Sequence, residues 1–472
     1  MKSLLTLASM VFVASCAIVG PNYEPPQIEL AKHYAFANSP ELENAAFDRW
    51  WSTFHDPVLD SYMEQGLTNG LNIKLAQERI IEAQSLFRAA GGKSRLPAQL
   101  SGNGTAAVGI SETGGVRTES ETASLGATFV FDLFGGVARG IEQAGAELDA
   151  AFYNAQTVRL AYQSELVAAY IETRYYQTAI NLARRSIANR QRTLGLVQER
   201  VDANVATVLE SSRAEAELSL VRADLPSLQI GFESNAVRLA TLLTEPTQSV
   251  IKHLQATHKG IPNPTHKFAP GVPANLLRNR PDIMSAERTL AARMAAVGVS
   301  EAALYPSLSL GGSIRASSTA DNTLQIGPSL TIPLLSRPRL LINRDAAISR
   351  AKQAEISWHV TARAAVSEVE QTLSRARNRR TEINALTQAS RNYTRLTRLS
   401  GESFELGAST LLELLDAQEN VSSAANALAR ARRAYALAIA ELSVSTGHGA
   451  RVGETPAAAS TDAVAQLDST KP

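Results

Sequence analysis

The chain has 472 residues, a formal net charge of +1 at pH 7 and an aromatic content of only 6%. This balance of charge gives no indication of nucleic-acid binding. The single cysteine, Cys16, excludes an internal disulfide and any metal site built on several thiolates. Heavy use of Ala, Leu, Ser, Glu and Arg favours long packed helices over several small domains.

The N-terminus has the layout of an export signal. Lys2 supplies a short positive region, residues 4 to 13 supply an apolar core, and "VASC" (13 to 16) supplies a cleavage site of small residues. Residues 1 to 15 are therefore predicted to be removed as a signal peptide.

The cleavage site also suggests a lipid anchor. "VASC" is similar to the bacterial lipobox, which implies acylation of Cys16 and a lipid-anchored extended segment over residues 16 to 55. The residue after the cysteine is Ala17 and not Asp. In lipoproteins of this kind, the absence of Asp at this position favours transfer to the outer membrane. The alternative is an ordinary signal peptide with an incidental cysteine, although this cysteine stands at the cleavage position.

Four segments have the alternating pattern of β-strands. Residues 306 to 317 and 322 to 334 alternate between apolar and polar side chains around the polar turn "STAD". Residues 98 to 111 and 120 to 134 are a looser counterpart in the first half. The two segments of the second half have about the ten-residue length of a strand that crosses a bilayer. A pair of soluble hairpins is the alternative, but two similar pairs in a lipid-anchored chain favour membrane strands.

The strands belong to an internal duplication. "ASLGATFVFDLFG" aligns with "LQIGPSLTIPLLS" at an offset of 201 residues, and "RVDANVATVLESSRAE" (200 to 215) aligns with "SFELGASTLLELLDAQ" (403 to 418) at an offset of 203. Each half is expected to contain a helix, two strands, a long helix, a turn and a return helix. The first repeat covers residues 56 to 245 and the second covers residues 278 to 447.

Long helices are predicted over residues 136 to 203 and 339 to 406, because neither span contains a proline. In the first, residues of one face recur every seven positions, which is a coiled-coil period: Ile141, Leu148, Ala155, Tyr162, Ala169, Tyr176 and Ala183. A rise of about 1.5 Å per residue gives each helix a length of roughly 100 Å. The turns at 204 to 208 and 407 to 410 are thus expected far from the strands.

Shorter helices are expected to stack and match the long ones in length. The first return helix runs to about Glu245, and a new helix begins at "RPDIMSAE" with Pro281 in its first turn. We expect this new helix to continue the first return helix in space. The helix from about 409 to 446 is expected to continue into the helix from about 72 to 95. Residues 246 to 277 then form an insertion at mid-height.

The remaining segments are placed more simply. Trp50 and Trp51 are expected to be packing anchors in a belt at mid-height. Residues 448 to 472, rich in Ala, Ser and Thr, are expected to be a disordered tail.

Several segments carry a family resemblance, namely "GPNYEPP" after the cysteine, "FDLFGG", and "VPANLLRNRPDIMSAERTLAARMAAVGVSEAALYPSLSLGG". They resemble the NodT-type lipoprotein branch of the TolC-like outer-membrane factors, and the similarity covers the mature chain up to about residue 450. The resemblance implies a mainly α fold with a β-barrel portion. Long coiled-coil-like helices would form a periplasmic α-barrel, and four strands per chain would contribute to a shared twelve-stranded outer-membrane barrel. Three copies are favoured because eight strands leave little room for a pore.

The resemblance also implies a function and partners. The homotrimer would be the outer-membrane exit duct of a tripartite efflux system, passively conducting small toxic compounds. Its partners would be a periplasmic adaptor (membrane fusion) protein, an inner-membrane efflux pump and outer-membrane lipid. Two alternatives stay open, a duct for type I protein secretion and a lipid-anchored structural coiled coil without a pore.

In this family the helical turns form the periplasmic tip, where the adaptor docks. By position, the docking turns are Asn204, Val205, Ala206, Thr207, Gly407, Ala408, Ser409 and Thr410. Gly407 can adopt the positive φ that such a turn often needs, and Asn204 is the next best residue for it.

The resemblance also implies a periplasmic gate just after the second turn. Glu413 and Asp416 match the acids that line the closed tip in relatives, and Leu412 and Leu415 are expected to add an apolar constriction. Six carboxylates in a trimer would favour cations and repel one another. Without the resemblance, the alternative is the solvated face of an amphipathic helix.

No catalytic motif stands out, so the chain is not expected to be an enzyme or to need a cofactor beyond the covalent lipid on Cys16. "GGKS" ends like a phosphate-binding loop, but Phe87 occupies the position of the first glycine. His253, His258 and His266 lack the spacing of metal ligands on one helix face, so no metal site is expected.

Overall fold

The computed structural model describes residues 18–37, 48–95, 98–110, 117–257, 259–264, 272–318 and 320–450. The predicted signal peptide, Cys16, His258, His266 and the tail after residue 450 lie outside these residues.

Long helices dominate the described chain, and its strands form one sheet. In chain order the elements are η1 (Trp50–Phe54), α2 (Pro57–Asn69), α3 (Leu71–Arg95), β1 (Ala98–Ile110), β2 (Arg117–Phe131), α4 (Gly136–Asp202), α5 (Val208–Leu243), α6 (Thr247–Ala256), η2 (Pro273–Asn275), α7 (Leu276–Asn279), α8 (Pro281–Ala302), β3 (Ser307–Ser317), β4 (Thr323–Thr331), α9 (Arg337–Glu405) and α10 (Leu411–Ser445). None of the helices in the described part of the chain has the length and apolar character that a membrane crossing requires.

The four strands form an antiparallel sheet in the order β1-β2-β3-β4, so β2 and β3 join the two repeats. The register aligns apolar side chains across the strands: Leu125 pairs with Ile314, which pairs with Leu324. These three side chains are 51%, 55% and 68% exposed. The next row, Gly126, Ser313 and Gln325, lies on the opposite face because side chains alternate along a strand. The predicted alternation therefore gives one apolar and one polar face.

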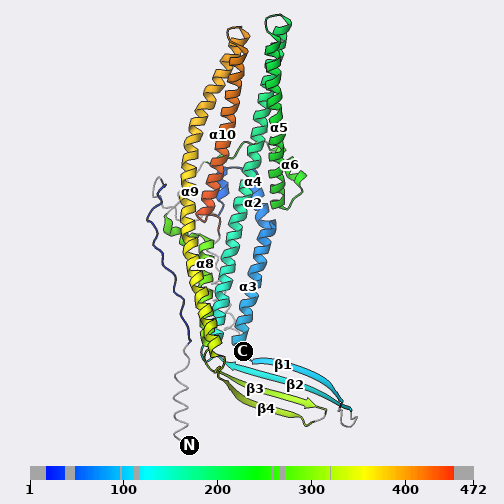
Figure 1. Cartoon of the computed structure of the whole chain (residues 1–472), viewed down its shortest axis with the longest axis vertical. Helices are drawn as coiled ribbons and strands as arrows, with labels where there is room; N and C mark the ends of the chain where they lie inside the picture. Colours follow the sequence, from blue (N-terminus) through cyan, green and yellow to red (C-terminus); the bar gives the residue numbers. More distant parts are fainter. Residues whose placement is uncertain are drawn as a thin grey trace.

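The sheet lies at one end of an elongated molecule and the two helical turns lie at the other (Figure 1). The long helices α4 and α9, of 67 and 69 residues, connect the two ends. β4 ends at Thr331, earlier than the predicted residue 334, because Pro333 offers no backbone N–H for a strand ladder.

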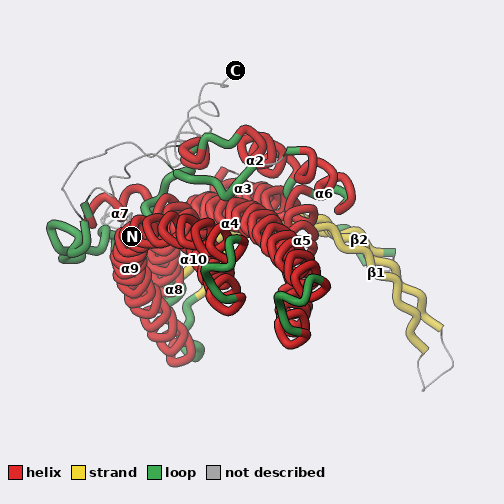
Figure 2. The backbone as a smooth tube through the Cα atoms, turned by 90° about the horizontal axis from the view of Figure 1, so that it is seen from above, coloured by secondary structure: helices red, strands yellow, loops and turns green. Residues whose placement is uncertain are grey.

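The predicted stacking of the shorter helices is wrong. In the half nearer the turns, α10 contacts both α4 and α9, and in the half nearer the sheet α8 contacts the same two helices. α8 therefore continues α10, and α3 takes the place of α5 beside α4 (Figure 1). Seen along the long axis, α4 lies between α5 and α10 (Figure 2). The order around the molecule is α5 (or α3), α4, α10 (or α8), α9.

The largest core lies at mid-height, where α2, α4, α5, α6 and α10 meet. Trp50 and Trp51 are 0% and 2% exposed within it, so the predicted packing anchors are confirmed. The chain stays packed beyond α10, with His448 and Ala450 only 5% and 3% exposed. The predicted start of the disordered tail at residue 448 is therefore too early.

Residues 18–37 form an extended strap along the outside of the helices (Figure 1). Near the sheet, Val19 N donates to Phe134 O at 3.2 Å. At mid-height, Ala35 N donates to Glu370 Oε1 at 2.7 Å. The strap therefore spans the lower half of the molecule.

Candidate functional site

The first tip turn closes the end of α4. Asn204 N donates to Val201 O at 2.9 Å and Val205 N donates to Arg200 O at 2.8 Å. This pair of bonds is the Schellman arrangement, which requires a residue of positive φ. Asn204 supplies it with φ 58°.

The second turn repeats this geometry 203 residues later. Gly407 N donates to Phe404 O at 3.0 Å and Ala408 N donates to Ser403 O at 2.8 Å. Gly407 has φ 73°, so the predicted positive φ is confirmed at both turns.

Each return helix then begins with a capping box. Thr410 Oγ1 accepts from Glu413 N at 3.3 Å, and Thr410 N donates to Glu413 Oε2 at 3.1 Å. Thr207 and Glu210 form the same pair at the start of α5. The carboxylate of Glu413 thus interacts with its own helix N-terminus, where negative charge is favourable. The Thr-x-x-Glu spacing at residues 207–210 and 410–413 is a sequence signal that could have predicted both caps.

The structure separates the four gate residues into two sets. Leu412 is 44% exposed, and Glu413 and Asp416 are exposed beside it. Leu415 is only 5% exposed and packs with Val197 and Leu411 in a core at the tip. A side chain buried inside the chain cannot line an opening, so the expectation for Leu415 is corrected.

The two tips differ in their exposed apolar residues. Val208 and Leu209, which begin α5, are 72% and 77% exposed. The equivalent Leu411 of α10 is 3% exposed because α10 lies between α4 and α9, and it packs with Val197 and Phe404 of these helices. α5 lies at the edge of the chain, so its first turn has no such cover among the described residues.

A row of polar contacts joins α4 to α10 below the tip. Ser186 Oγ and Ser422 Oγ are 3.1 Å apart, Arg190 Nη2 donates to Glu419 Oε2 at 2.8 Å, and Gln418 Nε2 donates to Thr193 Oγ1 at 2.8 Å. The predicted heptad pattern ends at Ala183, and one further step of seven residues reaches Arg190. A charged residue at such a core position could have predicted a buried ionic contact here.

Arg190 is the centre of this row. It is 1% exposed and also donates from Nη1 to Glu217 Oε2 on α5 at 3.0 Å. Closer to the tip, Arg200 Nη1 donates to Phe404 O at 2.9 Å, and its guanidinium lies 4.7 Å from the centre of the Phe404 ring. The contacts of Arg190 therefore tie both return helices to α4, and those of Arg200 tie the end of α9 to it.

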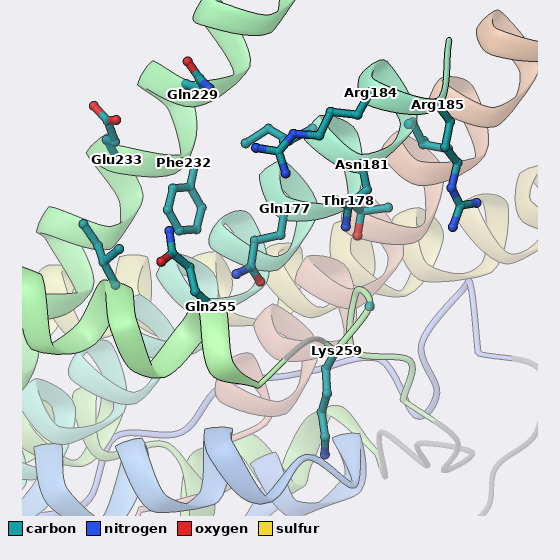
Figure 3. Close-up of a pocket in the computed structure, with 14 residues that line it drawn as sticks. Gln177, Thr178, Asn181, Arg184, Arg185, Gln229, Phe232, Glu233, Gln255 and Lys259 are labelled. Atoms are coloured by element: carbon teal, nitrogen blue, oxygen red, sulfur yellow. The ribbon is translucent and has the colours of Figure 1, made fainter. Parts of the chain in front are cut away.

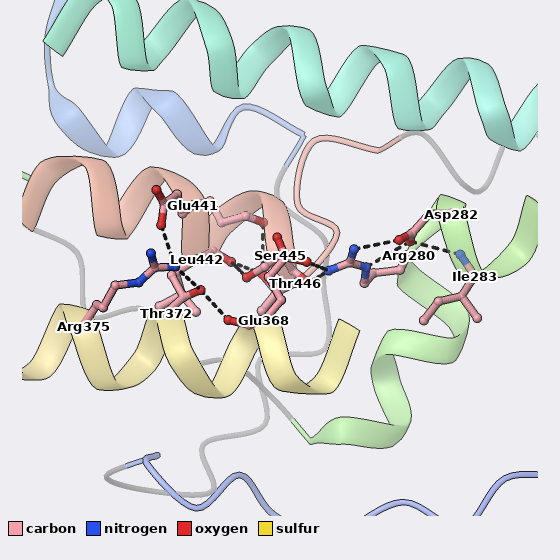
Figure 4. Close-up of polar contacts among 11 residues, drawn as sticks. Arg280, Asp282, Ile283, Glu368, Thr372, Arg375, Glu441, Leu442, Ser445 and Thr446 are labelled. Atoms are coloured by element: carbon pink, nitrogen blue, oxygen red, sulfur yellow. Dashed lines mark hydrogen bonds and ion pairs between the residues drawn. The ribbon is translucent and has the colours of Figure 1, made fainter. Parts of the chain in front are cut away.

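At mid-height, Arg280 connects the end of α10 to the start of α8 (Figure 4). Its guanidinium donates to both carboxylate oxygens of Asp282, to Glu368 Oε2 at 2.7 Å and to Ser445 O at 2.9 Å. Burial lowers the pKa of Arg280, but the hydrogen bonds and charges of Asp282 and Glu368 outweigh it and hold the pKa above its ordinary value. This arginine lies in the "LLRNRPDI" segment, and it explains why α8 stacks on α10.

The other joint, between α5 and α3, is held by groups of α4 and α2. Tyr162 OH donates to Leu242 O at 2.7 Å near the end of α5. Burial, with a smaller contribution from Glu165, raises the pKa of Tyr162 to about 12, so the hydroxyl keeps its proton at neutral pH. Gln65 Nε2 donates to Glu245 Oε1 at 2.6 Å beside it.

A cavity of about 500 Å³ lies between α4, α5 and α6 (Figure 3). Arg184, Arg185 and Lys259 border it, together with amide side chains such as Gln177 and Gln229. The two arginines and the lysine are exposed, so the cavity is an open polar surface.

Of the three histidines that were weighed and rejected as metal ligands, only His253 lies among the described residues. His253 Nδ1 lies 2.9 Å from Tyr62 OH in the mid-height core. Among the described residues, no cluster of three or more His, Cys, Asp or Glu side chains could hold a metal ion.

Comparison with known proteins agrees with this architecture. The sequence profile described as "Outer membrane efflux protein" matches residues 65–245 and 272–448, which are the two repeats. Nodulation protein T of Rhizobium leguminosarum bv. viciae is 34% identical, and the alignment covers 98% of both chains. Pyoverdine export outer membrane protein OpmQ of Pseudomonas aeruginosa is 27% identical, over 95% of this chain and 97% of OpmQ.

A solved structure has the same fold. The outer-membrane channel OprN superimposes with a TM-score of 0.82 and 28% sequence identity, covering 92% of this chain and 99% of OprN. The predicted combination of long helices and a four-stranded sheet is confirmed. The chain belongs to the outer membrane efflux protein family.

Proposed function

We propose that this chain is the outer-membrane exit duct of a tripartite efflux system and that it works as a homotrimer with a periplasmic adaptor and an inner-membrane pump. The observation that carries this proposal is the match of both repeats to the efflux family together with the channel fold. Relatives named for export, such as OpmQ, favour efflux of small compounds over protein secretion. A structural rod without a pore does not account for the channel fold.

The sheet supports sharing of a barrel between copies. Its apolar face is exposed and its other face is polar, as expected for lipid on one side and water on the other. In the described chain, β1 and β4 each have one edge that pairs with no strand. Joining β4 of one copy to β1 of the next would remove all open edges, and three copies give twelve strands.

The helices at the two edges of the chain also support a ring in which the α9 edge of one copy meets the α5 and α3 edge of the next. Both edges expose apolar residues along their length: Leu71, Leu75, Ile81 and Leu86 on α3, Leu220, Ile230 and Val237 on α5, and Ile342, Ile356, Val360, Leu396 and Leu399 on α9. The edges also differ in charge. Residues 375–398 of α9 carry seven arginines and one acid, whereas residues 208–233 of α5 carry five acids and two arginines. Opposite charges on the two edges favour contact between α9 of one copy and α5 of the next.

The internal duplication supplies a template for that contact. Within the chain, the long helix α4 of the first repeat packs against the return helix α10 of the second. In a ring of copies, the long helix α9 would meet the next return helix, α5, in the same relation. The residues equivalent to the α4–α10 contact are then Ala389, Tyr393, Leu396, Ser400 and Ser403 on α9 and Val208, Ser212, Glu215, Ala216 and Ser219 on α5. All ten are exposed or half-buried in the single chain.

The strap supports lipid anchoring at Cys16. Ile18 lies against Gly135, and Val19 N bonds to Phe134 O, where the sheet meets α4. Arg139, which is 4% exposed, also holds the start of the strap, because its Nε donates to Val19 O at 3.2 Å. Cys16 precedes Ile18 by two residues, so an acyl chain on it would reach the membrane beside the proposed barrel.

The tip is proposed as the gate and the adaptor contact. Leu412, Glu413 and Asp416 form the exposed face after the second turn, and a trimer would place three copies around one axis. The docking residues remain the two turns, Asn204, Val205, Ala206, Thr207, Gly407, Ala408, Ser409 and Thr410. Carboxylates at a narrow opening attract cations and repel one another, which favours dilation.

Single-channel conductance in planar bilayers tests this proposal. The wild type should show a small, cation-selective conductance, and Glu413→Ala/Asp416→Ala should show a larger or less selective one. Glu210→Ala is the matched control, because it removes the same capping interaction from the first repeat without touching the proposed gate. No conductance from folded trimers of any variant would contradict the duct, and equal effects of Glu210→Ala and the double variant would contradict the gate.

A further inference from the structure

We infer that Arg315, near the far end of β3, forms a positively charged ring at the mouth of the duct and that this ring binds and selects anionic solutes. This inference rests on the proposed trimer and adds a specificity-determining residue to it. Three copies of Arg315 would lie around one axis, at the opposite end of the molecule from Glu413 and Asp416 (Figure 1).

Arg315 lies on the polar face of the sheet. It pairs with Ser124 of β2 and with Thr323 of β4. Its neighbour Ile314 belongs to the apolar face, and side chains alternate along a strand, so Arg315 projects from the other face. In a barrel whose apolar face contacts lipid, that other face lines the interior.

Arg315 carries the only charge on this face among the strand residues whose side chains the structure describes. The other charged residues of that set are Glu119 and Glu121, which lie on the apolar face because an even number of positions separates each from Leu125. Arg315 is exposed and forms no hydrogen bond or ion pair with a described residue. Within the described part of the sheet, no carboxylate on the same face neutralises its charge.

The position of Arg315 along β3 places the ring near the outer mouth. β3 begins at Ser307 beside the helices and ends at Ser317, two residues after Arg315. At about 3.3 Å per residue, Arg315 lies roughly 25 Å along the strand from Ser307. This length is comparable to the height of the apolar band of a membrane barrel, about 25 Å. The ring therefore lies at the end of the crossing that is remote from the helices.

Small residues line the face between the ring and the helices. Gly311 pairs with Gly327, and a Cβ added at either position would meet nothing within 4 Å. Gly126 pairs with Ser313 in the row between these glycines and Arg315. The long side chain of Arg315 can therefore reach further toward the axis than these neighbours, and ions can approach its guanidinium.

A ring of three guanidinium groups favours anions for two reasons. Like charges in an aqueous passage with low-dielectric walls create a potential that raises the local concentration of counter-ions. Each guanidinium also donates paired hydrogen bonds that match two oxygens of a carboxylate, phosphate or sulfate group. Solutes with such groups are therefore the class that this mouth concentrates. The acids proposed at the tip have the opposite sign, so the two ends of the duct differ in ion preference.

Block by a polyvalent anion tests the ring. Inositol hexakisphosphate is added to one side of a planar bilayer at a time, and single-channel current is recorded for the wild type and for Arg315→Gln. Thr323→Arg adds a second charge to the same row. Glu121→Gln is the matched control, because it removes a charge from the opposite face at the same end of the sheet. Trimers of every variant are verified on gels before recording.

We expect the wild type and Glu121→Gln to be blocked alike from the side that the sheet faces. Arg315→Gln should need at least about tenfold more of the anion for half-block, and Thr323→Arg should need less than the wild type. The inference is overturned if neither Arg315→Gln nor Thr323→Arg shifts the block, if Glu121→Gln weakens it as much as Arg315→Gln does, or if the wild type is not blocked from that side. Absence of conductance from all four folded trimers would instead contradict the proposed duct.

Discussion

The two repeats have the same backbone conformation but different residues at the positions where φ is positive. Asn204 and Gly407 close the long helices with φ of 58° and 73°, and Thr244 and Gly447 close the return helices with φ of 57° and 85°. Each pair is separated by 203 residues. The second repeat has glycine at both points, and the first repeat has glycine at neither.

This difference shows that two repeats can share a backbone geometry without sharing the residue that adopts it. A left-handed conformation costs a residue with a Cβ atom roughly 1–2 kcal/mol, and Asn tolerates it better than a β-branched residue. Thr244 keeps it because the end of α5 is held from outside, by Tyr162 at Leu242 O and by Gln65 at Glu245. The fold thus tolerates strain where neighbouring groups fix the chain.

Among the substitutions at these positions, Gly447→Ala should lower the free energy of unfolding the most. A Cβ at Gly447 would meet the backbone carbonyl of Asn279 as well as a positive φ. The sum of strain and overpacking predicts a loss of about 3 kcal/mol in the free energy of unfolding. Denaturant unfolding of the purified protein, followed by circular dichroism, measures the loss. Thr244→Ala is the control. It should change the free energy of unfolding by less than about 0.5 kcal/mol, because threonine and alanine both carry a Cβ at this positive φ.

Gly407→Ala should have a smaller effect. Only the tip of Arg200 lies near the new Cβ, at 4.0 Å, so the cost is the positive φ alone, about 1.5 kcal/mol. Gly407→Asn makes the second turn resemble the first and should cost less than half of that. Thermal unfolding of the two variants provides the ranking, and a cost for Asn as large as that for Ala would contradict the idea that the turns are equivalent.

The capping boxes offer a test in which the repeats should behave alike. Thr207→Ala and Thr410→Ala each remove one hydrogen bond to a backbone N–H and should each cost about 1 kcal/mol. Proteolysis at the tips provides a local measurement, because a frayed first turn is cleaved faster. Thr→Ser at either position keeps the hydroxyl and should restore the wild-type rate. A cost at only one tip would show that tertiary contacts override the cap.

Thr244→Gly should give the smallest change and the opposite sign. Relief of the left-handed strain outweighs the extra flexibility of glycine in the unfolded chain, for a net gain of about 0.5 kcal/mol. The same substitution should leave conductance unchanged, since Thr244 lies at the α5–α3 joint and not at the tip. A loss of stability would mean that the Thr244 side chain makes a contact that outweighs its strain.

The duplication, the strands and the long helices could be predicted from sequence because each has a periodic signal. Helix stacking could not, because the lengths of the pieces do not discriminate. α5 and α10 have 36 and 35 residues, and α3 and α8 have 25 and 22, so either pairing fills the length of a long helix. The deciding group is Arg280, whose bond to Ser445 O joins α8 to α10. Such a contact between residues 165 positions apart has no local signature in one sequence.

The gate shows a different limit. Leu411, Leu414 and Leu415 follow the spacing of a buried helix stripe, and this pattern could have excluded Leu415 from the opening. The exposed set, Leu412, Glu413 and Asp416, is the opposite face of the same turn. The direction in which that face points within a trimer is set by contacts between copies, and such contacts have no local signal in the sequence of α10.

The strap formed by residues 18–37 has a consequence for the time course of folding. Tyr23 bonds to Glu287, 264 residues later, and Ala35 bonds to Glu370, 335 residues later. Contacts this distant in sequence form slowly, because the intervening chain must first be ordered. The strap can form these contacts only after α8 and α9 have folded. The strap is therefore expected to be among the last parts of the chain to dock.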